Sequence, residues 1–252
     1  MSVSNRRPAI DSSWKHRDGG RAGDGTLSGT VWGIERHVGS AASFHDRVVP
    51  ASPRRVVWWF EVDRPAVALG STQPADVVDV VKAERRGVEV VRRRSGGGAV
   101  WLDATSVTWV DVILPAADER WLDDVSRSAV WLGEIWAAVL SDLGVDGARV
   151  HEGRMERTED SSLVCFAGRA PGEVLVDGRK VVGISQRRTR SAARFQCALL
   201  HTWDPDLLVE FLAVSGGERG PMIGRLAEVA AGIGPIPSTT VVAAFLAHLR
   251  AT

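Results

Sequence analysis

The chain has 252 residues, of which 44% are hydrophobic, and its 31 Lys and Arg residues are balanced by 31 Asp and Glu residues. This length and apolar content suit a packed globular protein of one large domain or two small ones. Zero net charge argues against general binding to nucleic acid or to a membrane surface, because such proteins usually carry an excess of basic residues. The sequence also has no apolar run of transmembrane length and no apolar segment of a secretory signal at its N-terminus.

Composition predicts a flexible tail over residues 1–27, which are rich in Gly, Ser, Asp and Arg. The two cysteines, Cys165 and Cys197, are too few for a disulfide framework and form no CxxC motif. The histidines are scattered without the paired spacing of metal ligands. We therefore expect a reduced, cytoplasmic protein without a metal site.

Strands and helices are predicted without regular alternation along the chain. Apolar, β-branched runs predict strands at 54–62, 66–70, 88–91, 99–102, 106–115, 161–166, 172–188 and 193–203. Helical periodicity, with capping residues, predicts helices at 30–46, 74–87, 123–143, 205–213, 221–231 and 239–250. The expected fold is α+β, with a mixed, largely antiparallel sheet flanked by helices.

Two of these predictions rest on specific residues. The segment 172–188 is expected to be a hairpin, because Asp177-Gly178 is a strong type I′ turn sequence. In the helix at 74–87, an apolar face is expected from four valines, namely Val77, Val78, Val80 and Val81.

The segment "RRRSGGGAVWLD" (92–103) places three glycines beside three arginines. Successive glycines can present backbone N–H groups to an anion or a carbonyl, and arginines add positive charge for a phosphate or carboxylate. The glycines match neither a Walker A loop nor a dinucleotide-binding fingerprint, because a strand follows them and no Lys-Ser/Thr does. From the glycines alone, a ligand site and a plain glycine-rich turn with solvated arginines remain equally open.

Three segments in the same order favour the ligand site. "VVRRRSGGGAVWLD" resembles the RRxSGGGAVxxD motif of the lipoate–protein ligase A and octanoyltransferase family, which is related to biotin–protein ligases. "PAVALGSTQPADVV" resembles the family's strand–Gly-x-x-Gln–helix segment, and "VDGRKVVGISQRR" resembles its segment with an invariant lysine. The resemblance spans about residues 66–203. It implies a catalytic domain over 28–204, with a short helical segment, 205–252, packed on it.

The resemblance also implies a set of site residues. Lys180 is expected to lie against the acyl carbonyl. The expected residues around the acyl chain and any adenylate phosphate are Gln73, Arg92, Arg93, Ser95, Gly96, Gly97, Gly98, Ala99, Gly183 and Gln186.

Cys165 is the candidate nucleophile. "VCFAGRAPGEVLVDGRK" resembles the pattern of the cysteine-dependent octanoyltransferases, in which Cys-Phe precedes a Glu and then Gly-Arg-Lys. A free cysteine has a pKa of about 8.5, and a nearby ammonium group such as that of Lys180 would lower this pKa and hold a developing oxyanion. The alternatives are that Cys165 is a small buried apolar residue on a strand and that Lys180 is a solvated hairpin residue.

The resemblance therefore implies transfer of an octanoyl or lipoyl group to a lysine of a carrier domain. Acyl carrier protein would be the donor, and a lipoyl domain or a glycine-cleavage H protein would be the acceptor, with no cofactor. One alternative is an ATP-dependent ligase for lipoate, or for biotin, which would need ATP and Mg²⁺. Another is a non-catalytic relative that binds an acyl group or a carrier. No nucleic-acid or membrane partner is expected.

The chain departs from the family pattern at three positions. Leu102 stands where the family often has His, and Cys197-Ala198 replaces its His-Gly. The resemblance places these positions near the ligand, so the departures bear on the acyl substrate and on activity. A run of arginines is either a carrier-docking patch or a solvated strand edge; these are Arg187, Arg188, Arg190 and Arg194.

Overall fold

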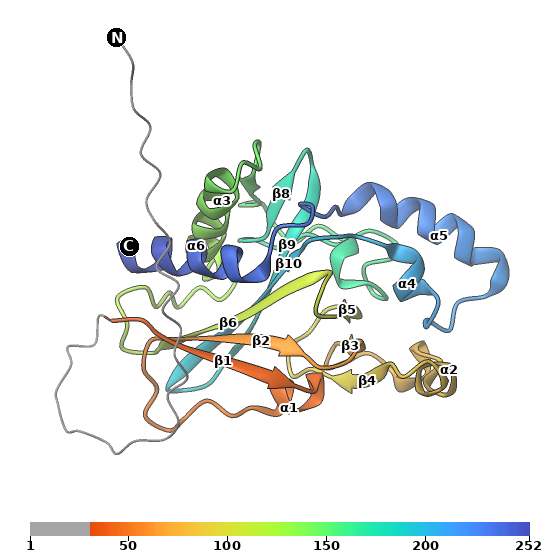
Figure 1. Cartoon of the computed structure of the whole chain (residues 1–252), viewed down its shortest axis with the longest axis horizontal. Coiled ribbons are helices and arrows are strands. Elements are labelled where there is room, and N and C mark those ends of the chain that lie inside the picture. The colour runs from red at the N-terminus through yellow and green to blue at the C-terminus, as the bar shows by residue number, and fades with distance from the viewer. Residues whose placement is uncertain (1–30) are drawn as a thin grey trace, which may run out of the picture.

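The computed structural model describes residues 31–252, so the tail expected at 1–27 lies outside the described residues. A seven-stranded sheet in the order β1-β2-β6-β10-β9-β8-β7 forms its centre (Figure 1). Its strands are β1 (Gly33–Gly39), β2 (Val56–Val62), β6 (Val107–Pro115), β10 (Ala192–Leu200), β9 (Arg179–Arg188), β8 (Val174–Val176) and β7 (Arg149–Val150). Only the β1–β2 pair of this sheet is parallel.

A second sheet has three strands in the order β4-β3-β5, namely β4 (Glu89–Arg92), β3 (Ala66–Leu69) and β5 (Val100–Leu102). The α-helices are α1 (Ala41–Asp46), α2 (Val80–Arg85), α3 (Val130–Asp142), α4 (Pro205–Val209), α5 (Gly216–Val229) and α6 (Ser238–Ala251). Single turns of 3₁₀ helix are η1 (Ala75–Val77) and η2 (Cys165–Ala167). The expected mixed, largely antiparallel α+β fold is confirmed, with the strands divided between two sheets.

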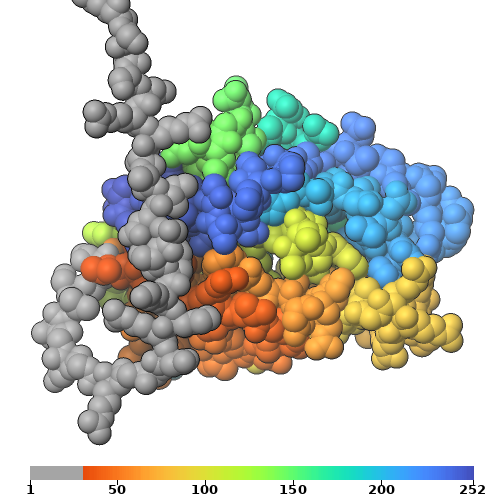
Figure 2. All heavy atoms as spheres, viewed as in Figure 1, coloured from red at the N-terminus to blue at the C-terminus, as the bar shows by residue number. Residues whose placement is uncertain are grey.

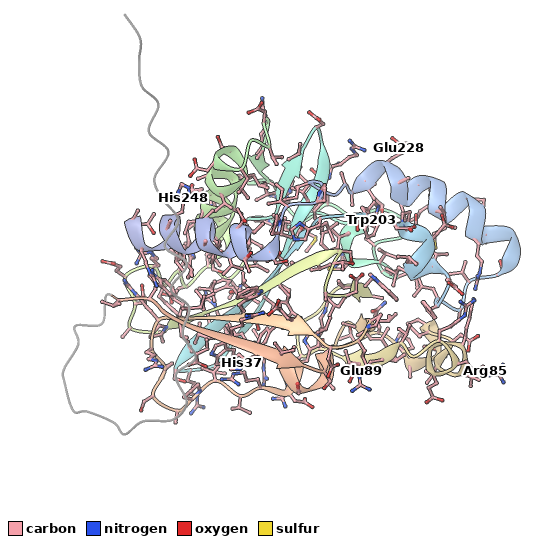
Figure 3. The ribbon with its side chains drawn as sticks, viewed as in Figure 1. His37, Arg85, Glu89, Trp203, Glu228 and His248 are labelled. Atoms are coloured by element: carbon pink, nitrogen blue, oxygen red, sulfur yellow. The ribbon has the colours of Figure 1, made fainter. Side chains whose placement is uncertain are left out.

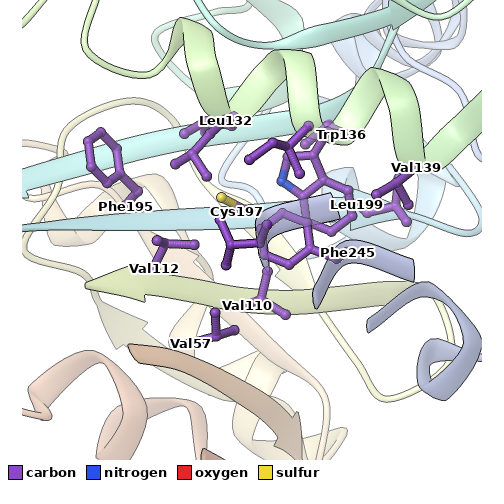
Figure 4. Packing of buried hydrophobic residues seen from close by; sticks show 14 of the residues in the cluster. Val57, Val110, Val112, Leu132, Trp136, Val139, Phe195, Cys197, Leu199 and Phe245 are labelled. Carbon is purple, nitrogen blue, oxygen red and sulfur yellow. The ribbon is translucent and has the colours of Figure 1, made fainter. Parts of the chain in front are cut away.

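Three apolar clusters hold these layers together. The first lies between the seven-stranded sheet and α3 with α6, where Trp136 stacks on Phe245 at 4.5 Å (Figure 4). The second lies between the two sheets and includes Trp58, Phe60 and Trp109. The third joins the small sheet to α4 and α5. In the space-filling view, the C-terminal segments cover the upper half of the visible face and the segments nearer the N-terminus the lower half (Figure 2).

The predicted hairpin at 172–188 is confirmed. Strands β8 and β9 are antiparallel and joined by Asp177 and Gly178, whose φ angles are 49° and 76°. Positive φ at both positions is what a type I′ turn requires. This turn sets the register that brings Lys180 into the protein interior.

The predicted helix at 30–46 is wrong over most of its length. Residues 33–39 form β1, which pairs with β2 along seven residues, and the helix begins only after the N-cap Ser40. The weak helical periodicity of this segment is overridden by the ladder with β2, since tertiary pairing outweighs local propensity.

The strand predicted at 161–166 is a turn followed by η2. The segment makes one isolated bridge, between Val164 and Ala99, and the carbonyl of Asp160 accepts from the backbone N–H groups of Leu163 and Val164. Its backbone therefore bonds to itself and to the glycine-rich loop, and this irregular path presents Cys165 at a turn.

Three predicted helices are shorter than expected, and the one predicted at 205–213 ends at Val209 as α4. The helix at 74–87 is split into η1 and α2, because Val78 forms a bridge with Leu212. Val80 and Val81 are therefore exposed and form no apolar face. The helix predicted at 123–143 begins at Val130.

The C-terminal helices pack on two different clusters: α4 and α5 on the small sheet, and α6 on α3. Trp203, labelled in Figure 3, donates from Nε1 to the carbonyl of Leu226 on α5 (2.8 Å). Within residues 31–252, no helix has the length and apolar character needed to cross a membrane.

Candidate functional site

Two cavities meet at Cys165. A narrow pocket of about 40 Å³ with mostly apolar walls runs between the two sheets. A wide groove of about 1030 Å³ opens on the other side of the cysteine. Cys165, Ile184 and Ser185 line both cavities, so the partly buried thiol lies at their junction.

The glycine-rich loop is packed directly against the cysteine. A Cβ at Gly98 would lie 2.5 Å from the carbonyl carbon of Val164, and one at Gly97, where φ is +99°, would lie 3.3 Å from Cys165 Sγ. Ala99 bonds to this segment from both sides, accepting from Cys165 N (3.0 Å) and donating to Leu163 O (2.7 Å). The glycines are thus needed where the two backbones touch, and Gly97 and Gly98 also line the groove.

Gln73 and Arg92 support this arrangement through backbone groups. Gln73 accepts from Gly70 N (2.9 Å) and donates to the carbonyls of Ser162 (3.0 Å) and Leu163 (3.1 Å). Arg92 donates to the carbonyl of Gly70 (2.9 Å) and lines neither cavity. Both residues therefore fix loops around Cys165.

Arg93 is a buried cation that lines the narrow pocket, with 6% of its surface exposed. Its Nη2 donates to the carbonyls of Gly96 (2.7 Å) and Gly98 (2.8 Å), and its Nε has no partner. No carboxylate among residues 31–252 forms an ion pair with it. A buried guanidinium group without a carboxylate leaves a positive potential beside the thiol.

Lys180 is buried and fully bonded. Its Nζ donates to both carboxylate oxygens of Glu173 (3.0 Å each) and to the carbonyls of Cys165 (2.9 Å) and Gly168 (2.8 Å). The alternative of a solvated hairpin lysine is wrong, since Lys180 is 1% exposed. Four acceptors for three protons leave no free donor in this arrangement.

The remaining predicted residues lie around the junction. Ser95 is buried, accepts from Ser185 Oγ (3.1 Å) and donates to Gln196 Oε1 (3.0 Å). Gly183 lines the pocket. Gln186 lines the groove, where its Nε2 donates to the carbonyl of Val125 (2.7 Å). Gly96, the most open of the three glycines, also lines the groove.

Cys197 lies on the other face of the sheet. Its side chain points among Leu132 and Trp136 under α3 (Figure 4). Burial raises the pKa of this thiol to about 12. Of the two cysteines, Cys165 is therefore the one in position to react. All three departures from the family pattern, Leu102, Cys197 and Ala198, are among the residues that line the narrow pocket.

The expected arginine patch is not a single surface. Arg194 is buried and paired with Asp111, and its guanidinium also donates to the carbonyls of Phe44 and Arg47 (2.7 Å each). Arg188 stacks over Trp121 at 4.3 Å, while Arg187 and Arg190 are exposed. Arg194 is thus a structural residue.

Sequence reasoning missed Glu173 and His45 as site residues. Glu173 follows Cys165 by eight positions in the motif that identified the cysteine, so a signal existed. His45 comes from α1 and lines the narrow pocket, and nothing in its sequence context indicates this. Over residues 31–252, no cluster of three or more His, Cys, Asp or Glu side chains is arranged to hold a metal ion.

Curated proteins with sequences similar to this chain include two octanoyltransferases. Octanoyltransferase LipM of Carboxydothermus hydrogenoformans is 32% identical over 165 residues, which is 65% of this chain and 60% of the relative. Octanoyltransferase LipM of Kyrpidia tusciae is 33% identical over 168 residues, covering 65% and 59%. The match therefore spans about three fifths of the length of these curated relatives.

Solved structures of lipoate protein ligases have a fold similar to that of this chain. A bi-partite lipoate protein ligase from Thermoplasma acidophilum superposes with a TM-score of 0.67 at 19% identity, over 86% of this chain and 80% of that chain. A lipoate-protein ligase A bound with ATP gives a TM-score of 0.62 at 20% identity, over 86% and 82%. The family model for the lipoyl protein ligase A/B catalytic domain matches residues 42–232. The chain belongs to the lipoyl protein ligase A/B catalytic domain family.

Proposed function

We propose that this protein carries an octanoyl or lipoyl group on Cys165 as a thioester and transfers it to a lysine of a carrier domain. The observation that carries the proposal is the position of Cys165, where a narrow apolar pocket meets a wide groove with charged side chains in its wall. The apolar lining of the pocket suits an acyl chain, and the donor thioester and the acceptor lysine would reach the acyl carbonyl through the groove. The similarity to octanoyltransferases supports the same reaction.

The reaction proceeds in two steps. The thiolate of Cys165 attacks the thioester carbonyl of an acyl carrier protein, the acyl–sulfur bond to the carrier breaks, and the carrier thiolate leaves and takes up a proton. The neutral amine of a lysine then attacks the acyl-Cys165 carbonyl. An amide forms, and the thiol of Cys165 is regenerated with the proton that the amine loses. No cofactor is consumed, because each thioester drives the next acyl transfer.

Two cations would stabilise the charge that develops at Cys165. Arg93 has no carboxylate partner among the described residues, so its charge is available to the thiolate and the oxyanion. Lys180 can donate to the acyl carbonyl only if its Nζ gives up two of its four present acceptors, for example one Glu173 oxygen and the carbonyl of Cys165. We assign Glu173 the role of a positioning residue that holds the ammonium group beside the loop of Cys165.

The groove fits the partners of this reaction. Positive charge predominates on its walls, because the Lys180–Glu173 pair is neutral and two further glutamates, Glu152 and Glu156, face four arginines, namely Arg127, Arg154, Arg157 and Arg169. Such a surface would attract acidic carrier proteins by charge complementarity. We propose acyl carrier protein as the donor and a lipoyl domain or a glycine-cleavage H protein as the acceptor, the two docking in turn over the groove.

The size and charge of the groove also favour a second candidate, an ATP-dependent lipoate ligase. A volume of about 1030 Å³ accommodates a nucleotide, and the arginines of the wall suit its phosphates. Mg²⁺ would then be held mainly by those phosphates, as is usual for this ion. In this reading Cys165 has no covalent role.

Octanoyl transfer from acyl carrier protein to a lipoyl domain tests the proposal, measured with and without ATP. The transferase reading predicts ATP-independent acylation of the carrier lysine, lost in Cys165→Ala and kept in the matched control Cys197→Ala. Acylation of the lysine by free lipoate that requires ATP and survives in Cys165→Ala would establish the ligase instead. Binding of the acyl group without transfer under either condition would leave a non-catalytic relative.

A further inference from the structure

Arg225 is an arginine of α5 that holds the segment leading to Cys165. Its Nε and Nη2 donate to the two carboxylate oxygens of Asp160 (2.8 Å each), and Nε also pairs with Glu159 (2.9 Å). Asp160 is 6% exposed, so its carboxylate is shielded from water. Two parallel bonds between a guanidinium group and a carboxylate fix both the distance and the orientation of the two groups. Arg225 therefore fixes Asp160 on α5.

Asp160 begins the turn that presents the thiol. Its carbonyl accepts from the backbone N–H groups of Leu163 (2.9 Å) and Val164 (2.8 Å), and Cys165 is the next residue. On the other side, the glycine-rich loop holds the same turn through the bridge between Ala99 and Val164. The turn is thus held between the loop and α5.

The end of the same helix is bonded to the strand that carries Lys180. The N–H group of Ala231, just after α5, donates to the carbonyl of Lys180 (3.0 Å), and Ala230 forms an isolated bridge with this lysine. The helix contacts both β9 and η2 (Figure 1). Arg225 lies about one turn of helix before this end of α5. One rigid element therefore connects the segment of Cys165 to the strand of Lys180.

Arg225 and Asp160 act from outside the two cavities. Neither residue lines the narrow pocket or the groove, so neither is in position to contact an acyl group bound there. Ser161 and Ser162, which follow Asp160, line the groove, and Cys165 lines both cavities. A displaced turn would therefore move the thiol without removing a contact of this pair to the substrate. Such displacements matter, because a shift of about 1 Å in a reacting group can slow a reaction about a hundredfold.

We infer that Arg225 is a positioning residue for acyl transfer, which acts through Asp160 to hold the turn of Cys165 in place. The helix α5 thereby keeps the thiol segment at a fixed separation from the strand of Lys180. The inference rests on the proposed thioester at Cys165. It makes α5, which lies beyond residues 66–203 where the sequence motifs occur, a part of the site.

Single-turnover acylation of Cys165 tests this role. Octanoyl pantetheine thioester is the donor, and the intact mass of the protein is followed over a range of thioester concentrations. Arg225→Ala is expected to lower the maximal rate on the order of tenfold and to leave the half-saturating thioester concentration within about twofold of wild type. Arg225→Lys keeps the charge but not the paired donors, so its maximal rate should lie between those of Arg225→Ala and wild type.

Two further variants show whether Arg225 acts through its partner. Asp160→Asn should lower the maximal rate to a similar extent, and combining it with Arg225→Ala should add little, because the two residues form one pair. The matched control is Arg219→Ala on the same helix, since Arg219 donates to the backbone carbonyls of Glu210 (3.3 Å) and Leu212 (3.5 Å). It should stay within about twofold of the wild-type rate.

A wild-type maximal rate in Arg225→Ala would overturn the inference and leave the thioester on Cys165 standing. So would a rate loss that Arg219→Ala shares, or losses in Arg225→Ala and Asp160→Asn that add fully in the double variant. If Arg225→Ala does not fold, Arg225→Lys decides the question, and a maximal rate equal to that of wild type overturns the inference. Absence of an adduct on Cys165 in the wild type would overturn the proposed function as well.

Discussion

Lys180 is a buried ammonium group whose charge is balanced by one carboxylate, that of Glu173 (3.0 Å to each oxygen). The sequence motif predicted Lys180 as a site residue, but it could not predict the partner. Pairing depends on the bulged register between β8 and β9, which brings Glu173 beside Lys180. A lysine next to a hairpin turn is usually solvated, and only the fold makes this one an interior residue.

Glu173→Gln is expected to lower the free energy of unfolding by about 3 kcal/mol, because it leaves the Lys180 charge buried without its counter-ion. Urea denaturation measures this change. Glu156→Gln is the control, since the Glu156 side chain is 59% exposed and pairs with Arg169 only at 3.5 Å. It should change stability by less than about 0.5 kcal/mol. Equal effects of the two substitutions would contradict the buried pair.

The pH dependence of stability tests the protonation state of His45. Its pKa is lowered from 6.5 to about 3 in the folded protein, so between these values the unfolded chain binds a proton that the native state does not. Stability is therefore expected to fall as the pH decreases from about 6.5 towards about 3. His45→Phe lacks this contribution, so its unfolding free energy, from urea titrations across the range, should depend less on pH. Parallel curves for the two proteins would refute a neutral His45.

At the scale of elements, the glycine-rich loop and the turn at Cys165 are one structural unit. The resemblance implied that both segments contribute to one site, and in the structure they are joined by the bridge between Ala99 and Val164. The strand predicted at 161–166 was wrong, because its backbone bonds to a turn, to Gln73 and to the loop, and apolar composition does not reveal that. The type I′ hairpin was predictable, since two adjacent residues determine it.

Gly98→Ala is expected to displace the Cys165 turn, because the new Cβ would lie 2.5 Å from the Val164 backbone. We expect a loss of about 1–3 kcal/mol in stability and a slower acylation of Cys165. The matched substitution is Gly96→Ala, whose Cβ would meet no atom within 4 Å. It should leave the unfolding free energy within about 0.5 kcal/mol of wild type. If Gly96→Ala were as damaging as Gly98→Ala, the loop would matter through flexibility and not through close packing.

At the scale of the whole molecule, the seven-stranded sheet separates a structural face from a reactive one. The α3 and α6 helices cover one face, and the small sheet covers the other and encloses the narrow pocket. The fold class was predictable from the irregular mixture of strands and helices. Division into two sheets was not, because β2 and β3 are joined by a short turn yet pair with different partners. Long-range pairing of this kind leaves no local signal.

Phe245→Ala tests this separation of faces. Phe245 is fully buried against Trp136 at 4.5 Å, so its truncation is expected to cost about 3–5 kcal/mol of stability. Because the residue lies on the face away from Cys165, the folded fraction should acylate its thiol at nearly the wild-type rate. Chemical denaturation gives the first quantity, and single-turnover acylation below the melting temperature gives the second. A large rate loss in protein that is still folded would show that the two faces are coupled.

The central claim is a thioester on Cys165, and the most direct measurement is the intact mass of the protein after mixing with octanoyl-acyl carrier protein in the absence of ATP. The account predicts one octanoyl adduct that maps to Cys165, is removed by hydroxylamine, and persists in Cys197→Ala. An unlabelled Cys165, together with ATP-dependent acylation of a carrier lysine, would contradict it.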